Sequence, residues 1–284
     1  MATDGAGADH GAHEGARPPA QRAQPKTAAF FDLDKTIIST SSATAFSRPF
    51  LAGGLLTRRA VLRTAYAQFF YLVGAADANQ TERLRRELSR MVAGWEVAQV
   101  SAIVEETLHE SIDATVYAEA VALIDEHHAA GRDVVIVSAS GGEVVRPIAA
   151  LLGADHVIAT RMGVAEGRYT GEIDFYAYGP HKEVAIRELA ARNGYDLDAS
   201  YAYSDSITDA PMLGAVGNAS AVNPDRALRR LAAQEGWEVL TFTRPVPLRA
   251  LLRPGRPAAL TAGLVLLGAA LLAWRLAVRA RRRG

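Results

Sequence analysis

The stretch AAFFDLDKT, residues 28–36, decides the fold and carries the first candidate chemistry. Residues 28–33 are predicted to form a strand, because the run is β-rich and apolar until it reaches Asp32. Asp32 and Asp34 stand at its carboxyl end, where ligands bind in open parallel sheets. Residues two apart on an extended strand point the same way, so both carboxylates can enter one crevice. A hard divalent ion with oxygen ligands, magnesium above all, suits such a pair.

Further β-rich runs alternate with helical patterns along the chain. They cover residues 134–137, 156–158, 201–203 and 219–222, and this alternation predicts an α/β fold with a Rossmann-like parallel sheet sandwiched by helices. Within 162–173, a Glu-Gly pair separates two short runs, which predicts a β-hairpin projecting from the sheet edge.

Three more polar groups are expected at the same edge of the sheet. Ser138 directly follows the apolar run 134–137, so its hydroxyl and the Ala139 amide could hold phosphate oxygens. Lys182 begins a helical pattern, where its ammonium could enter the crevice beside the positive end of the helix. Asp205 and Asp209 follow the run 201–203. Each residue alone could be an ordinary loop or surface group, but together they indicate a site.

In this order, the four segments resemble the four motifs of haloacid dehalogenase superfamily phosphatases. DLDKT at 32–36 matches the first, Ser138 the second, Lys182 the third and SDSITD at 204–209 the acidic fourth. The resemblance spans about residues 27–242. The helical pattern between the first two motifs is similar to the C1 cap of subfamily IB, the phosphoserine phosphatase-like group.

The resemblance implies a role for each acidic residue. Asp32 would attack phosphorus to form an aspartyl-phosphate, and Asp34 would act first as general acid and then as base for water. Mg²⁺ would be bound by the carboxylates of Asp32 and Asp205 and by the Asp34 backbone carbonyl. Asp209 would support the metal or the lysine of the third motif.

The same resemblance implies which groups bind the phosphoryl oxygens. Ser138 and Lys182 would bind them and stabilise charge in the transition state, with the Ala139 amide beside them. Thr36 would contribute to this phosphate site and orient the nucleophile.

Two positions depart from the family pattern. The fourth motif usually opens with Gly-Asp, whereas Ser204 precedes the aspartate here. Phosphoserine phosphatases of this type carry a glutamate nine residues after the nucleophile, which holds the substrate ammonium. Ser41 occupies that position, so the sequence lacks the acid that serine phosphate would need.

The segments outside the motifs predict the domain organisation. Residues 1–26 form a disordered tail rich in Gly, Ala, His and Pro, 41–115 a helical cap, and 27–40 with 116–246 the catalytic core. The apolar and aromatic stretch 66–73 is either the core of the cap or a surface facing substrate or lipid. Residues 247–257 are a linker, 258–278 a transmembrane anchor, and 279–284 a basic tail.

The composition of the chain excludes some classes of partner and of chemistry. Lys plus Arg equal Asp plus Glu at 31 each, so there is no net basic field for nucleic acid. The absence of cysteine excludes disulfides and thiolate nucleophiles. Residues 258–274 carry no charge and precede several arginines, which favours a single-pass membrane protein. Arginines lie on both sides of this run, so charge does not give the orientation. The N-terminal residues lack the apolar stretch of a secretory signal, so the catalytic domain is expected on the cytoplasmic side.

The sequence therefore predicts a magnesium-dependent phosphomonoesterase, with a membrane lipid phosphate as its expected substrate. Two alternatives remain open at this point: a phosphatase of a soluble metabolite such as phosphoserine, and a catalytically silent, membrane-bound regulatory protein. The oligomeric state is not indicated.

Overall fold

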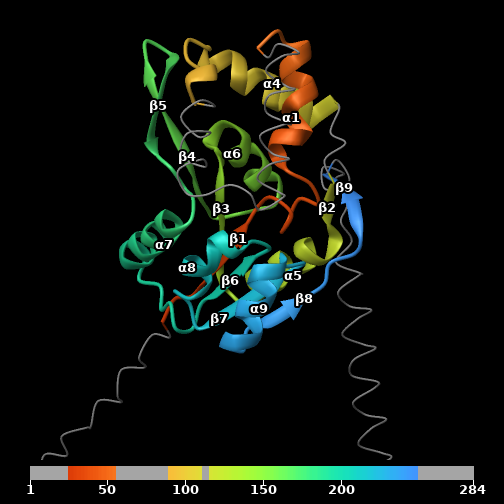
Figure 1. Ribbon diagram of the computed structural model, residues 1–284, viewed down its shortest axis with the longest axis vertical. Coiled ribbons are helices and arrows are strands. Elements are labelled where there is room, and N and C mark those ends of the chain that lie inside the picture. The colour runs from red at the N-terminus through yellow and green to blue at the C-terminus, as the bar shows by residue number, and fades with distance from the viewer. Residues whose placement is uncertain (1–24, 56–88, 111–114, 249–284) are drawn as a thin grey trace, which may run out of the picture.

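The computed structural model describes residues 25–55, 89–110 and 115–248 of the 284-residue chain. Its main sheet has seven strands in the order β5-β4-β3-β1-β6-β7-β8 (Figure 1). These strands are β1 (Ala28–Asp32), β3 (Asp133–Gly141), β4 (His156–Ala165), β5 (Arg168–Phe175), β6 (Tyr201–Ser204), β7 (Asn218–Val222) and β8 (Glu238–Leu240). All neighbouring pairs are parallel except β4 and β5. The predicted α/β parallel sheet is confirmed.

The first strand lies at the centre of this sheet, between β3 and β6. All five of its residues are buried, as the continuous apolar run predicts for a strand covered on both faces. Phe30 and Phe31 point to opposite faces and belong to two separate hydrophobic clusters. Burial of both rings fixes the register of β1 and with it the position of Asp32.

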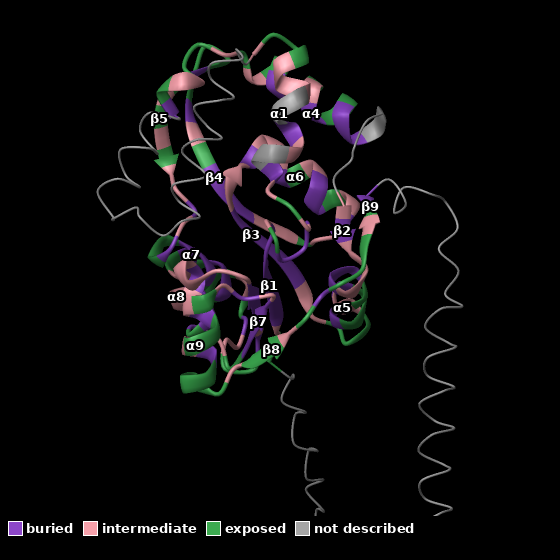
Figure 2. Ribbon diagram, turned by 45° about the vertical axis from the view of Figure 1, so that its right-hand side comes forward, coloured by how far each residue is buried: buried purple, intermediate pink, exposed green. Residues whose placement is uncertain are grey.

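Helices cover both faces of the sheet, and the strands between them are largely buried (Figure 2). On the Phe31 side lie α5 (Ala118–Ala129) and α6 (Gly142–Leu151). On the Phe30 side lie α7 (Pro180–Asn193), α8 (Ala210–Leu213) and α9 (Arg226–Glu235). A short 3-10 turn, η1 (Ile207–Asp209), precedes α8.

The predicted hairpin is present. β4 and β5 pair antiparallel from Arg161 with Phe175 to Ala165 with Arg168. The turn between them consists of Glu166 and Gly167, with φ of 51° and 75°. Two successive positive φ angles match the right-handed twist of the flanking strands, which explains why a tight turn forms there.

Two described helices belong to the predicted cap region, α1 (Ser42–Ala52) and α4 (Val97–Glu110). They lie at one end of the molecule, above the carboxyl end of β1 (Figure 1). Phe46 and Phe50 of α1 contact each other, and the Phe50 ring lies 6.4 Å from that of Trp95. The apolar stretch 66–73 lies outside the described residues.

A second, two-stranded sheet was not predicted. β2 (Thr115–Tyr117) pairs antiparallel with β9 (Pro245–Pro247). Two of the three residues of β9 are prolines, which flank Val246. Proline cannot donate a hydrogen bond to a β-ladder, so it is confined to the edges of sheets. Leu248 is buried, so the folded chain continues two residues past the predicted core boundary at 246.

The C-terminal prediction concerns residues that the structure does not describe. The expected anchor, 258–278, and the basic tail, 279–284, both fall outside the three described ranges, as does almost all of the N-terminal tail. In the described ranges, no helix combines the length and apolar character needed to cross a bilayer.

Candidate active site

The predicted site residues converge at the carboxyl ends of three adjacent strands. Asp32 ends β1, Ser138 lies in the last part of β3, and Ser204 ends β6. Because β1 has β3 on one side and β6 on the other, this edge is a switch point of the kind where open α/β sheets bind ligands. Lys182 reaches the same edge from the first turn of α7.

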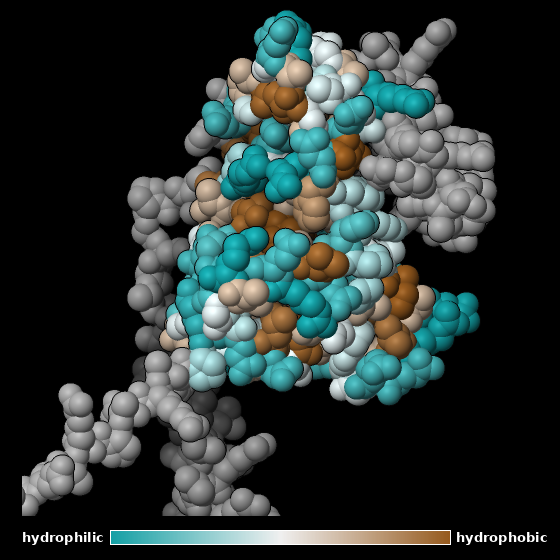
Figure 3. Space-filling view, turned by 90° about the vertical axis from the view of Figure 1, so that its left-hand side faces the viewer, coloured by the Kyte–Doolittle hydropathy of each residue, from teal (hydrophilic) through white to brown (hydrophobic). Residues whose placement is uncertain are grey.

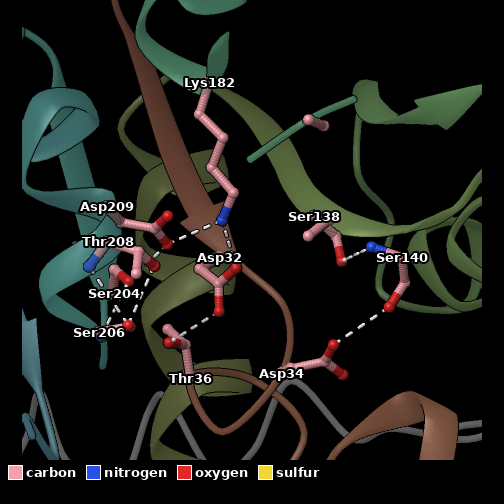
Figure 4. A network of polar contacts seen from close by, with 12 residues as sticks. Asp32, Asp34, Thr36, Ser138, Ser140, Lys182, Ser204, Ser206, Thr208 and Asp209 are labelled. Carbon is pink, nitrogen blue, oxygen red and sulfur yellow. Dashed lines mark hydrogen bonds and ion pairs between the residues drawn. The ribbon is translucent and has the colours of Figure 1, made fainter. Parts of the chain in front are cut away.

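A buried ion-pair cluster occupies the centre of the site (Figure 4). The Lys182 Nζ lies 2.6 Å from Asp32 Oδ1 and 2.7 Å from Asp209 Oδ2. All three residues are almost fully buried, with 2%, 6% and 2% of Lys182, Asp32 and Asp209 exposed. A buried charge persists only when it is paired, so this geometry requires the three groups to stay together.

The charges and the burial shift the pKa values of the cluster. Burial raises the pKa of Asp32 well above its ordinary value, against the opposing charge of Lys182. Burial alone would lower the pKa of Lys182, but the charges of Asp32 and Asp209 raise it above its ordinary value. The lysine is therefore a permanent cation beside the candidate nucleophile.

The loop after β1 returns a hydroxyl to Asp32. The Ile37 and Ile38 amides both donate to the Leu33 carbonyl, which closes a tight turn, and Lys35 adopts a left-handed φ of 61°. The turn places the Thr36 Oγ1 3.3 Å from Asp32 Oδ2, to which it donates. The two oxygens of Asp32 thus face different donors.

Asp34 is held in a different direction from Asp32. Its carboxylate accepts from the Ser42 amide at 2.6 Å and from the Ser42 hydroxyl at 3.2 Å. The Ser140 hydroxyl also donates to it, at 3.1 Å. In Figure 4 the Asp34 carboxylate points toward Ser140 and away from Lys182. Ser42 is the first residue of α1, so this acid connects the core to the cap.

The second candidate motif is a bulged strand end. The register of β3 against β4 shifts between Ser138 and Gly141. Ser138 is 1% exposed, and its hydroxyl accepts from the Ser140 amide at 3.2 Å. The Ala139 carbonyl accepts from the Thr160 hydroxyl at 2.7 Å, which fixes this segment against β4. A bulge re-aims successive backbone groups, as a phosphate-binding segment would require.

The fourth motif explains the serine at the usual glycine position. The Ser204 hydroxyl donates to Asp209 Oδ2 at 2.7 Å and accepts from the Ser206 amide at 3.3 Å. Ser204 therefore orients the carboxylate that pairs with Lys182. The neighbouring Asp225 caps α9 and accepts from the Ile207 amide at 2.9 Å, which anchors the segment from behind.

Asp205 differs from Asp32 and Asp209 because, in the described ranges, it has no lysine or arginine at ion-pair distance. Burial raises the pKa of Asp205 to about 7, and the charge of Lys35 opposes this shift only in part. A carboxylate in such a position is stabilised by an added positive charge. This is the electrostatic environment that a divalent cation would complete.

These residues fit a magnesium ion held by few protein ligands. In the described ranges, no cluster of three or more His, Cys, Asp or Glu side chains forms a ready ligand set. The predicted set needs only the carboxylates of Asp32 and Asp205 and the Asp34 carbonyl, and Mg²⁺ usually retains several waters. The excess of carboxylates over cations supports this donor set.

The predicted site residues meet at one sheet edge, on strand ends, on loops, on η1 and on the first turn of α7. Prediction from sequence missed the hydroxyls that orient them: Ser42 and Ser140 on Asp34, Thr160 on Ala139, and Ser204 on Asp209. Ser42 lies in the sequence IISTSS at 37–42, and Ser140 lies in the run SAS at 138–140. Nothing in their spacing distinguishes them from ordinary loop serines.

A comparison with protein-family models matches residues 29–214 to the haloacid dehalogenase-like hydrolases. A relative from Streptomyces azureus, named inhibition of morphological differentiation protein, is 60% identical over 85% of this chain and 92% of its own. A probable phosphatase of Mycobacterium tuberculosis is 60% identical over 81% of this chain and 84% of its own.

More distant similarities reach phosphoserine phosphatases. The M. tuberculosis protein named phosphoserine phosphatase SerB1 is 38% identical over 83% of this chain and 76% of its own. A solved phosphoserine phosphatase, a phospho-aspartyl intermediate analogue, has a TM-score of 0.57 at 20% identity and covers 81% of this chain and 98% of that one. At that identity the likeness concerns the fold.

Proposed function

Because the chain belongs to the haloacid dehalogenase-like hydrolases and is a phosphatase, we propose that it hydrolyses a small soluble phosphate monoester with Asp32 as the nucleophile. The observation that carries this proposal is the buried contact of Lys182 with Asp32 and Asp209. A cation fixed within 2.6 Å of the nucleophile can bind the phosphoryl oxygens while they transfer.

The first half-reaction forms a bond between an Asp32 carboxylate oxygen and phosphorus, and the bond from phosphorus to the ester oxygen breaks. Lys182 stabilises negative charge on the phosphoryl oxygens, and Thr36 holds the second Asp32 oxygen. Ser138 and the Ala139 amide complete the phosphate site. Asp209, held by Ser204, keeps the lysine in place.

Asp34 supplies the protons. It gives one to the leaving oxygen and, once ionised, accepts one from the water that attacks the aspartyl-phosphate. The bond from phosphorus to the Asp32 oxygen then breaks, which releases phosphate and regenerates the Asp32 carboxylate. Ser42 and Ser140 determine the position of its carboxylate before substrate binds. Bound magnesium, on Asp32, Asp205 and the Asp34 carbonyl, would neutralise charge on the substrate and the nucleophile.

The proposed substrate class follows the relatives rather than the lipid expectation. A relative at 38% identity bears the name phosphoserine phosphatase, which supports a soluble phosphate ester. Ser41 stands where that enzyme type has the ammonium-binding glutamate, so we expect esters without an ammonium group to be turned over at least as well as phosphoserine. The lipid substrate remains a prediction, based on the expected anchor outside the described ranges and on the missing acid at Ser41.

A substrate panel tests the proposal. The full chain with Mg²⁺ should hydrolyse p-nitrophenyl phosphate, and Asp32→Asn should abolish turnover because an amide oxygen is a far poorer nucleophile. Phosphoserine, glycerol phosphate and lysophosphatidate in micelles are then compared. Equal background for wild type and Asp32→Asn would refute the enzyme mechanism, whereas turnover of lysophosphatidate alone would restore the lipid substrate.

A further inference from the structure

A recess lies at the edge of the main sheet, outside the residues of the candidate active site. β5 pairs with β4 only from Arg161 onward, so in the described structure no strand covers the outer edge of β4 at residues 157–159. A cavity of about 200 Å³ lies there, lined by β4, by Phe175 of β5, and by residues of α6 and α7.

Three arginines from three different elements line this recess: Arg146 from α6, Arg161 from β4 and Arg192 from α7. One acid, Glu188, lines it as well, and lies 3.9 Å from Arg192. Within the described ranges, neither Arg146 nor Arg161 has a carboxylate at ion-pair distance. The recess therefore carries an excess of two positive charges.

Polar atoms make up most of the surface of the recess. Ile158, Ala159 and Ala185 line a smaller, apolar part of it, and the Arg161 guanidinium lies 5.4 Å from the centre of the Phe175 ring. Figure 3 looks onto the face that carries β5 and α7, and there apolar residues lie between groups of hydrophilic ones. The recess is therefore a mainly polar, positively charged site with a small apolar contact surface.

We propose that this recess is a second anion-binding site, for a small organic phosphate or phosphonate with a compact apolar body. Guanidinium groups form bidentate hydrogen bonds with phosphate oxygens, and arginines from three elements line this recess. The apolar lining residues would contact the body of the ligand. Desolvation of that contact adds affinity that a bare inorganic ion would not gain.

The recess is distinct from the candidate active site. Lys182 and Arg192 are ten residues apart on α7, which corresponds to roughly 15 Å along the helix. Lys182 is buried toward Asp32, whereas Arg192 is exposed at the far end. None of the residues that line the recess contributes to the proposed catalysis, so binding here does not depend on the proposed function.

Phenylphosphonate is a suitable probe because it carries a phosphonate on a flat apolar ring and cannot be hydrolysed. The full chain is first incubated with Mg²⁺ and beryllium fluoride to occupy Asp32, and phenylphosphonate is then titrated by calorimetry. We expect one binding event, weakened at least about tenfold in Arg161→Ala/Arg192→Ala, since each charge-assisted hydrogen bond contributes on the order of a tenfold factor or more.

Two further variants make the result decisive. Arg187→Ala removes an exposed arginine of the same helix, paired with Glu183 at 2.9 Å, and should leave the affinity unchanged. Arg146→Ala removes only the α6 arginine and should also weaken binding. The p-nitrophenyl phosphate turnover of each variant reports folding. No binding to the wild type, or equal affinity in the double variant, would overturn the proposed site.

Discussion

Ser140 shows how a single hydroxyl can matter to the proposed chemistry. It contacts the Asp34 carboxylate at 3.1 Å and the Ser42 hydroxyl at 2.8 Å, and its own amide contacts Ser138. Its position therefore connects the proposed acid with the proposed phosphate-binding segment. No other described side chain from β3 reaches Asp34.

Ser140→Ala should lower kcat about tenfold and leave KM nearly unchanged, because Asp34 is then held by Ser42 alone and is less well placed for proton transfer. Steady-state kinetics on p-nitrophenyl phosphate measure both constants. Ser39→Ala is the matched control, since the Ser39 hydroxyl contacts Thr115 instead. A change confined to KM would mean that Ser140 acts in binding and not on the acid.

His127 gives the protein an acid-sensitive stability. Its ring is buried against Phe31 and Tyr201, its Nε2 lies 2.9 Å from the Tyr203 hydroxyl, and burial lowers the pKa of His127 to about 4. The unfolded chain takes up this proton near pH 6.5, before the folded chain does. Stability is therefore complete above pH 6.5 and falls as the pH drops toward 4.

The loss attributable to His127 should reach up to about 3 kcal/mol at pH 4. Urea unfolding at pH 7.5, 6, 5 and 4.5 measures it in a range where most carboxylates remain ionised. His127→Gln should flatten the curve over this range, because glutamine keeps a hydrogen-bonding group and cannot be charged. Parallel curves for the two proteins would show that another group is responsible.

Some residues of the proposed site could be predicted from the sequence, because the proposed chemistry requires particular residue types at particular spacings. Asp32, Thr36, Lys182 and Asp209 could be predicted from sequence because their order and spacing match a motif set, and in the structure they contact one another. The supporting hydroxyls could not be predicted. Serines are common in loops, and only the folded chain determines which of them face a carboxylate.

At the scale of elements, the β4–β5 hairpin is connected to the cap. The Gly94 amide donates to the Tyr169 carbonyl, and the Tyr169 amide donates to the Trp95 carbonyl. The Val97 amide donates to the Gly167 carbonyl. Arg168 also forms an ion pair with Glu96. The hairpin thus pairs with residues 94–97 much as a neighbouring strand would, which fixes the start of α4.

Gly171 lies at the closest approach of the hairpin to the cap. A Cβ there would stand 2.9 Å from the Ala93 Cβ and 3.5 Å from the Arg90 Cα. Gly171→Val should therefore loosen this contact and raise amide hydrogen exchange over residues 94–97 by at least about tenfold. Gly167→Val is the control, because its φ is also positive but no atom lies within 4 Å. Equal exchange in both variants would locate the effect in backbone strain.

Longer, more apolar strands could be predicted from the sequence, whereas the shortest strands could not. The five strand runs and the hairpin are present because each buries an apolar face or has a distinctive turn. β8, β2 and β9 were missed: each has three residues, and two of the three in β9 are prolines. Such short strands are determined by partners distant in sequence, and no local pattern announces them.

The whole molecule combines a core with a predicted anchor that the structure does not describe. The residues of the proposed site and the groups that orient them come from 32–42, 138–160, 182 and 204–225, so residues beyond Leu248 are not part of the proposed chemistry. Removing residues 249–284 should preserve p-nitrophenyl phosphate turnover within about twofold and abolish sedimentation with membranes, if 258–278 spans a bilayer. A truncated protein that still sedimented with membranes would contradict the predicted anchor.

The class of fold could be predicted for the whole molecule, but the substrate could not. The alternation of strand and helix patterns predicts a parallel sheet covered by helices, and the structure has one. Substrate choice depends on what the cap presents to the site, and most of the predicted cap between α1 and α4 lies outside the described residues. The soluble ester therefore rests on relatives rather than on geometry.

In the proposed mechanism, Asp32 carries the phosphoryl group during turnover. Acid quenching of the full chain with Mg²⁺ and p-nitrophenyl phosphate, borohydride reduction and peptide mass spectrometry would identify the phosphorylated residue, because reduction converts an aspartyl-phosphate to homoserine. We predict homoserine at position 32, enriched in Asp34→Asn, where breakdown of the intermediate is slowed. Homoserine at position 34 or 205, or none at any aspartate during active turnover, would contradict the account.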